Sequence, residues 1–177
     1  MIFIYNYSAM DKQHLLYEIA LIGVDDKKYR FAIGKAMRLY GEDSSEVKTL
    51  WSQQKTLDAI NQQKIETIIG EYGYPGKSLV GSKLQNVALF VIQHASLEMQ
   101  EHYLPVIFEA AKNDELHKLP VLMLMDRIHL NKYGKQIFRS QSIWNEVKGK
   151  YEQAPIDETI DADSIRIALG LKPAIVN

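Results

Sequence analysis

The sequence predicts a mainly α-helical protein: a single helical domain of about six or seven helices with a small β-hairpin or meander near residues 128–147. Apolar residues recur at intervals of three and four through most of the chain before residue 128, which is the period of amphipathic helices. Short apolar runs on either side of Gly134 are typical of a hairpin. The whole length, residues 1–177, fits one domain, since domains commonly hold about 100–150 residues.

Two helices are predicted before Gly41. The first is expected to begin behind Asp11 as its N-cap and to end at Gly23, and the second covers residues 25–40. Both show apolar residues at helical spacing, and both are followed by glycine, a residue type common after helix C-termini.

The third predicted helix is the longest. Asp43 is expected to begin it, because Glu46 three residues later completes a pattern like a capping box. An apolar face that includes Ile60 continues as far as Gly73, and residues 74–76 (Tyr-Pro-Gly) then form a turn.

Three further helices are predicted up to residue 128. Ser82 is expected to cap the fourth, whose stretch 87–92 is apolar nearly all round and therefore central in the core. The fifth follows Ser96 and contains Pro105, where the missing backbone donor predicts a kink or a fresh start. Residues 119–128 form a short sixth helix.

The sequence pattern changes after this helix. Residues 128–130 and 136–138 are predicted to pair across a turn that contains Gly134, and residues 142–147 can add a third strand. An acidic segment then begins a last helix that ends at Gly170. The predicted core contains Val87, Ala88, Val91, Leu57, Ile65 and Leu122.

The composition argues against several classes of protein. Lys and Arg total 21 and Asp and Glu total 22, so the net charge of −1 favours neither nucleic-acid nor anionic-membrane binding. No apolar stretch is long enough to span a bilayer, and the apolar run after Met1 is too short for an export signal. The absence of cysteine excludes disulfides and thiolate chemistry. A cytoplasmic protein is expected, the alternative being a mature form from which an export signal has been removed, and the oligomeric state is left open.

No cofactor is predicted, because the chain lacks phosphate-loop, dinucleotide, zinc-protease and nucleophile-elbow motifs. His94, Glu98 and His102 have the spacing of one helix face and could bind a divalent metal on a continuous helix. Ser96, however, predicts a helix boundary between His94 and Glu98. The prediction is therefore that there is no metal site.

Polar residues at the ends of apolar helices are the candidate site residues. His94 directly follows the apolar fourth helix, and it is either a proton-transfer group or a core histidine with one hydrogen bond. Asp126 and Arg127 follow another apolar stretch, and an arginine there suits a ligand anion as well as a buried acid. The amides of Gln136 and Gln141 can position a substrate or lie at the surface.

These residues belong to six ordered motifs. The motifs are Asp58-Ala59-Ile60-Asn61 (D-x-x-N), Gly73-Tyr74-Pro75 with Leu79-Val80-Gly81, Gln93-His94-Ala95, Asp126-Arg127, Gly134-Lys135-Gln136 with Ser140-Gln141, and Pro155-Ile156-Asp157 with Arg166 and Gly170-Leu171. In this order the chain resembles a bacterial family known only as a domain of unknown function, over roughly residues 25–172. The resemblance supplies no activity, but it implies that the polar residues line a pocket.

The chain departs from the family pattern at two places. Arg139 stands where the resemblance implies a glycine, in the motif Y-G-T/S-Q. The motif D-Q-x-x-R near the N-terminus is matched loosely by residues 26–30 (Asp-Lys-Lys-Tyr-Arg). If the missing glycine allowed close approach of a ligand, Arg139 would put activity in doubt.

Two classes of function are compatible with these residues. In the first, the protein is an enzyme acting on a small or nucleotide-like anionic substrate, with His94 as general acid or base and Arg127 binding the anion in the same cleft. The supporting residues would be Asp126, which orients His94 or Arg127, and Gln136, Gln141, Asp58 and Asn61, which position the substrate. In the second, a non-catalytic ligand-binding or protein-interaction domain, for example a toxin-neutralising one, uses the same residues as a structural hydrogen-bond network.

Overall fold

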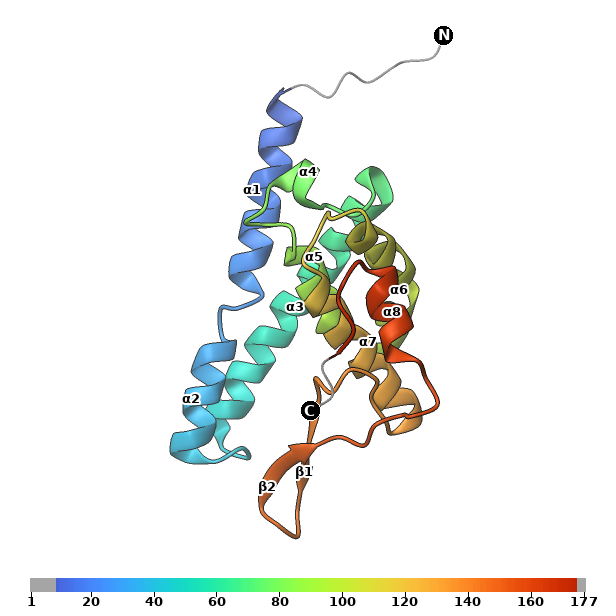
Figure 1. Cartoon of the computed structure of the whole chain (residues 1–177). Coiled ribbons are helices and arrows are strands. Elements are labelled where there is room, and N and C mark those ends of the chain that lie inside the picture. The colour runs from blue at the N-terminus through green and yellow to red at the C-terminus, as the bar shows by residue number, and fades with distance from the viewer. Residues whose placement is uncertain (1–8, 175–177) are drawn as a thin grey trace. The chain divides into compact units, whose positions relative to one another are not determined.

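The computed structural model describes residues 9–174 as helices joined by short loops, with one small antiparallel sheet (Figure 1). The predicted fold class, mainly helical with a small hairpin, is confirmed. The Cα positions divide the chain into two compact units, one ending at His94 and the other beginning at Ala95. None of the described helices is long and apolar enough to cross a membrane.

The first unit is built from helices alone. They are α1 (Ala9–Asp25), α2 (Arg30–Tyr40), α3 (Ser45–Tyr72), α4 (Lys77–Val80) and α5 (Val87–Gln93). Helix α3 packs against α1, α2 and α5, and α1 also packs against α4 and α5. As the apolar run predicts, α5 is the most buried of these helices, with Ala88, Leu89, Val91 and Ile92 almost fully buried.

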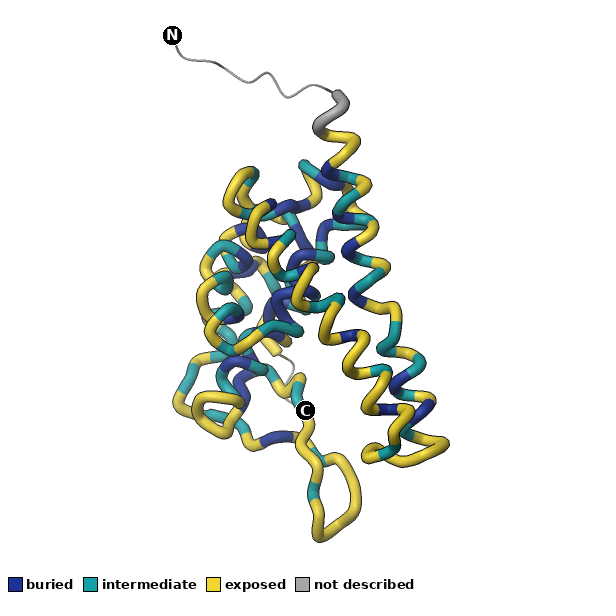
Figure 2. Tube along the Cα trace, turned by 180° about the vertical axis from the view of Figure 1, so that it is seen from behind, coloured by how far each residue is buried: buried dark blue, intermediate teal, exposed yellow. Residues whose placement is uncertain are grey.

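Buried and exposed residues alternate along the helices (Figure 2), and the buried face of α3 is more polar than the sequence predicts. Val47, Ile65 and Ile68 are buried on it, but so are the amides Gln54 and Asn61, spaced seven residues apart. Ile60, which the apolar pattern places inside, is 46% exposed. Of the predicted core residues, Ala88, Val91, Ile65 and Leu122 are buried, and Val87 and Leu57 are half-buried.

Helix boundaries in the first unit differ from the prediction in five places, one of which is the start of α2 at Arg30 and not at residue 25. Helix α1 begins before Asp11 and continues through Gly23, where a Cβ would lie 3.1 Å from Val87 Cγ2, so this glycine serves close packing and does not end the helix. The N-cap of α3 is Ser44, whose hydroxyl accepts from Val47 N, and Asp43 is outside the helix. Residues 81–86 form turns, so α5 begins at Val87 and not behind Ser82.

The second unit contains α6 (Leu97–Lys112), α7 (Lys118–Tyr133), β1 (Ser142–Asn145), β2 (Lys150–Gln153) and α8 (Ala162–Ala168). Helices α6 and α7 pack together. Ser96 caps α6 as predicted, by accepting from Met99 N. The helix continues through Pro105, so the alternative that a new helix starts at this proline is wrong. Asp161 caps α8, and Gly170 follows it in the left-handed conformation.

The hairpin lies further along the chain than predicted. Strands β1 and β2 pair antiparallel, with Ser142 opposite Gln153 and Asn145 opposite Lys150. Residues 128–130 instead continue α7, because Ile128 extends the buried stripe of that helix. Gly134, at φ 71°, donates its N–H to Leu130 O and ends the helix as a left-handed cap. The apolar runs around this glycine suit a helix end as well as a hairpin turn, and packing of α7 decided between them.

Candidate functional site

A cluster of charged and polar side chains joins the helices of the first unit. The guanidinium of Arg30, at the start of α2, donates through Nη2 to Asp58 Oδ1 at 2.7 Å and to Asp26 Oδ1 at 3.4 Å. Its Nε donates to the carbonyl oxygen of Asp26 at 2.6 Å. The side chains of Asp26 and Asp58 are only 6% and 13% exposed. One guanidinium therefore serves two largely buried carboxylates.

Gln54 is the fourth side chain of this cluster, after Arg30, Asp26 and Asp58. Its Nε2 donates to Asp58 Oδ1 at 2.8 Å and to the carbonyl oxygens of Asp25 and Asp26, each at 3.2 Å. Its Oε1 accepts from Tyr29 N at 3.0 Å. The fully buried amide thus ties the turn between α1 and α2 to α3.

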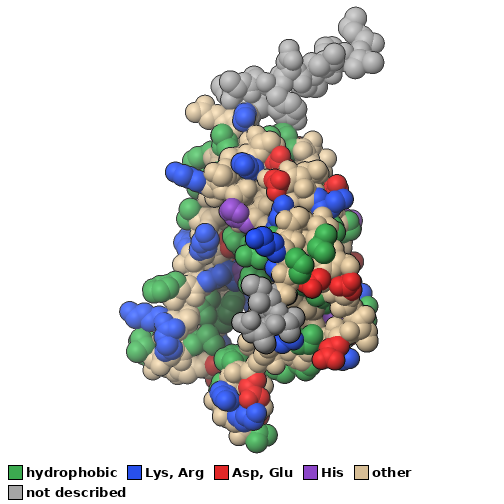
Figure 3. All heavy atoms as spheres, viewed as in Figure 1, with side chains coloured by type: hydrophobic (Ala, Val, Ile, Leu, Met, Phe, Trp, Pro, Cys, Tyr) green, Lys and Arg blue, Asp and Glu red, His purple; other side chains and the backbone are tan. Residues whose placement is uncertain are grey.

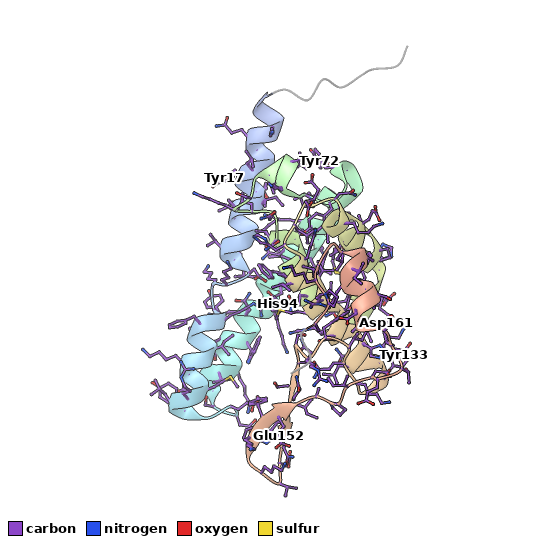
Figure 4. The ribbon with its side chains drawn as sticks, viewed as in Figure 1. Tyr17, Tyr72, His94, Tyr133, Glu152 and Asp161 are labelled. Atoms are coloured by element: carbon purple, nitrogen blue, oxygen red, sulfur yellow. The ribbon has the colours of Figure 1, made fainter. Side chains whose placement is uncertain are left out.

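His94 lies beside this cluster, directly after α5 (Figure 4). Its Nε2 is 4.0 Å from Asp26 Oδ1, and 28% of the side chain is exposed. The apolar run of α5 fixes this position, because the helix ends where burial ends. An imidazole that solvent can reach, beside a buried carboxylate, has the chemistry of a general acid or base.

Asn61 is the one buried side chain of this unit whose amide atoms both lack a partner among the described residues. It is 1% exposed, and neither Oδ1 nor Nδ2 makes a hydrogen bond. Asp58, one turn earlier on α3, is bound by Arg30 and Gln54. The two residues of the D-x-x-N motif therefore lie one turn apart on α3, but only Asp58 has hydrogen-bond partners. An unpaired buried amide costs about 1–3 kcal/mol, so the fold gains nothing from Asn61.

In the second unit, Asp126 organises the loop that follows α7. Its Oδ1 accepts from the backbone N–H groups of Ile137 at 2.6 Å and Phe138 at 2.7 Å. Its Oδ2 accepts from Ser140 N at 2.9 Å and from Ser140 Oγ at 2.7 Å. Both oxygens of this fully buried carboxylate are thus occupied by the loop. This geometry favours a structural role for Asp126 over proton transfer.

Gln136 is equally committed to the fold. Its Nε2 donates to the carbonyl oxygens of Gln141 at 2.9 Å and Ala154 at 2.7 Å, and its Oε1 accepts from Gln141 N at 2.7 Å. The side chain of Gln141 lies nearer the surface and donates to Ser140 Oγ at 3.0 Å. Arg127 is half-buried on α7, next to Asp126. His94 belongs to the first unit and Arg127 to the second, and their shared cleft stays a prediction.

Arg139 has φ 64°, in the left-handed region that favours glycine. The glycine implied at this position by the resemblance would suit that backbone conformation. A cavity of about 230 Å³ lies against Arg139 and is also lined by Phe138, Asp157 and Arg166. The departure from the motif therefore affects the backbone at the edge of a cavity.

The structure also pairs two residues that the sequence analysis did not single out as a site. His129 Nε2 lies 2.9 Å from Asp157 Oδ2, and Thr159 Oγ1 donates to Asp157 Oδ1 at 2.7 Å. The hydrogen bond from Thr159 and then that from His129 lower the pKa of Asp157 to about 2. The sequence does mark Asp157, because it belongs to the motif Pro155-Ile156-Asp157 near the C-terminus.

Signals for the first-unit cluster were weaker. Asp26 and Arg30 are the two ends of the loosely matched D-Q-x-x-R motif, whereas the mismatched Lys27 between them is exposed. Gln54 had no motif, and only its position one heptad from Val47 and Asn61 marks it as buried. Over the residues described, no group of three or more His, Asp or Glu side chains could hold a metal ion.

Comparison with known proteins identifies one family. A model described as a family of unknown function, DUF6624, matches residues 16–176. No curated protein and no solved structure matches the chain. The match covers all the motifs named above and assigns an activity to none of them.

Proposed function

The chain belongs to DUF6624, a family of unknown function, and from its own residues we propose that it is an enzyme acting on a small substrate with His94 as general acid or base. The substrate class that we propose is a small or nucleotide-like anion. A bacterial source and a cytoplasmic location are also proposals, which rest on the resemblance and on the absence of cysteine.

The observation that supports this proposal most is the pairing of His94 with Asp26. The carboxylate is held by Arg30 and faces Nε2 of a partly exposed imidazole at 4.0 Å. At this distance the contact is electrostatic and not a hydrogen bond, and the carboxylate stabilises the imidazolium formed when the ring accepts a proton. His94 can then exchange its proton with a bound substrate.

Asn61 supports a functional reading of the same unit. Its two unpaired amide atoms cost stability, and residues that a fold keeps at such a cost are typical of functional sites. Arg30 is already shared by two carboxylates, so it is not the group that holds a substrate anion. The anionic class of substrate rests on the sequence prediction that Arg127 binds an anion and that Gln141 positions the substrate.

The test is turnover of generic chromogenic esters by the purified protein. The substrates are p-nitrophenyl phosphate, bis(p-nitrophenyl) phosphate and p-nitrophenyl acetate, at pH 5.5 to 8.5. We expect His94→Gln to lower kcat by about 100-fold or more on any ester that is turned over, the range for loss of a general acid or base. His102→Gln, at an exposed histidine on α6, is the matched control. Equal turnover by wild type and His94→Gln would contradict the proposal.

A second candidate function is a non-catalytic binding or interaction domain. It is favoured by Asp126 and Gln136, whose polar atoms are committed to the loop and the hairpin. Arg127→Ala separates the two candidates. An unchanged unfolding midpoint with weakened binding of inorganic phosphate or AMP supports a ligand contact. A loss of about 3–5 kcal/mol of stability assigns Arg127 to the structural network.

A further inference from the structure

The near-zero net charge of the chain hides a strong local asymmetry. Five basic residues and no acidic residue occur between positions 27 and 41. Arg30 among them is bound by Asp26 and Asp58, but the side chains of the other four are exposed: Lys27, Lys28, Lys35 and Arg38. Figure 3 shows basic and hydrophobic side chains gathered over α2. Two further exposed lysines, Lys48 and Lys55, follow on α3, after the acidic residues Glu42, Asp43 and Glu46.

Exposed aromatic rings lie among these cations. Helix α2 buries Ile33 and Ala36, whereas Phe31, on the opposite side of the same helix, is 81% exposed. Tyr40, at the end of α2, is 60% exposed. A phenyl ring in this position contributes nothing to the core, and an amphipathic helix normally places such a ring inward. The fold therefore does not account for Phe31.

A groove on α3 shows a similar combination of side chains. It has a volume of about 620 Å³ and is lined by Trp51, by Lys48 three residues before it and by Lys55 four residues after it. Glu42, Val47 and Ser52 complete the lining. This spacing places the two ammonium groups on either side of the indole ring. Lys48 is 3.9 Å from Asp43, but both side chains are highly exposed, so the pair is weak. The groove thus offers a flat ring between two cations, with one carboxylate, that of Glu42, also in its lining.

We propose that this basic surface, formed by Lys27, Lys28, Lys35, Arg38, Lys48 and Lys55 with the rings of Phe31, Tyr40 and Trp51, binds single-stranded nucleic acid. Cations along a surface neutralise successive phosphates, and exposed rings stack on unpaired bases. A membrane-binding helix separates its apolar face from its cations, whereas here the two kinds of side chain alternate. Protein interfaces are depleted in lysine, and five of the six cations are lysines. The proposal does not depend on the His94 site.

The direct test is the fluorescence anisotropy of a labelled fifteen-nucleotide oligo(dT) titrated with the full-length protein at about 50 mM NaCl. We expect saturable binding that weakens with salt, with a slope of log K against log[salt] between about −2 and −4, since each phosphate contact on a single strand contributes about −0.7. Lys48→Gln with Lys55→Gln is expected to reduce the slope by about 1.4.

Trp51 provides a second readout. Trp51→Leu is expected to weaken binding at least about fivefold, the lower range for loss of one stacked base. Trp144→Leu, which removes the other tryptophan, on the exposed hairpin, is the matched control and should bind as wild type does. In the Trp144→Phe protein, Trp51 is the sole tryptophan, and oligo(dT) should quench its fluorescence. Circular dichroism confirms that each variant is folded.

Each of the following results would overturn the proposal. They are no anisotropy change up to about 100 μM protein, equal competition by poly-glutamate, equal binding by phosphatidylserine vesicles, and unchanged binding by Trp51→Leu. Equal affinity for AMP and for the oligonucleotide would also overturn it, because a pocket for one nucleotide gains nothing from a longer strand. His94→Gln should leave binding unchanged, which separates this proposal from the enzymatic one.

Discussion

Arg30 donates to Asp58 at 2.7 Å across 28 residues of sequence, and this contact ties the start of α2 to the middle of α3. The same guanidinium reaches Asp26 at 3.4 Å. Both carboxylates are largely removed from water, so each depends on Arg30 for its countercharge. The cluster beside His94 is therefore a stability element as well as a candidate site.

Arg30→Met should lower the free energy of unfolding by about 3–5 kcal/mol, because two buried carboxylates lose their countercharge. Urea unfolding followed by circular dichroism measures this change. Lys112→Met, which breaks the exposed pair with Glu109, is the control and should cost less than about 1 kcal/mol. Equal effects of the two substitutions would show that the Arg30 cluster is solvated.

Asn61→Leu should raise the free energy of unfolding by about 1 kcal/mol, since it replaces an unpaired buried amide with an apolar side chain of similar size. Gln54→Leu is the matched comparison on the same face of α3. It should cost about 2–3 kcal/mol, because the N–H of Tyr29 and two carbonyl groups lose their partner. Thermal unfolding of both variants decides the matter, and destabilisation by Asn61→Leu would contradict this account.

Asp126→Asn should destabilise the second unit by about 3 kcal/mol or more. The amide nitrogen cannot accept from Ser140, and two charge-assisted hydrogen bonds of roughly 1.5–3 kcal/mol each are lost. Amide hydrogen exchange gives a local readout. Relative to wild type, the exchange rates of the N–H groups of Ile137, Phe138 and Ser140 should increase more than those within α6. A uniform change across the unit would argue against local control of the loop by Asp126.

Arg139→Gly should stabilise the protein by up to about 1 kcal/mol. A side chain in the left-handed region costs about 1–2 kcal/mol, and glycine avoids this cost. Glycine also makes the unfolded chain more flexible, which offsets about 0.5–1 kcal/mol of the gain. Arg139→Ala keeps the backbone cost and removes only the guanidinium, so its unfolding midpoint should stay near that of wild type. If alanine stabilises as much as glycine, the charge and not the φ angle is responsible.

The pKa of Asp157 gives a prediction in acid. This pKa is lowered from 3.8 to about 2 in the folded protein, so the folded state favours the carboxylate. Its contribution to stability is present above pH 3.8 and is lost as the pH falls through about 2. The difference in unfolding midpoint between wild type and Asp157→Asn should therefore shrink over this interval. An NMR titration should show a higher pKa for Asp157 in Thr159→Val, since that hydroxyl is the largest cause of the shift.

The sequence by itself determined the helical class, the buried run of α5 and the caps at Ser96 and Gly73, because these depend on neighbours three or four residues apart. His94 could be placed at a helix end for the same reason. Local patterns could not choose between a hairpin turn and a helix cap at Gly134, since glycine suits both. Only tertiary structure brought Arg30 to Asp58, Gln54 to Tyr29 and Asp126 to the 137–140 loop. Such contacts join residues far apart in sequence, and their partners are set by how the helices pack, which no local period encodes.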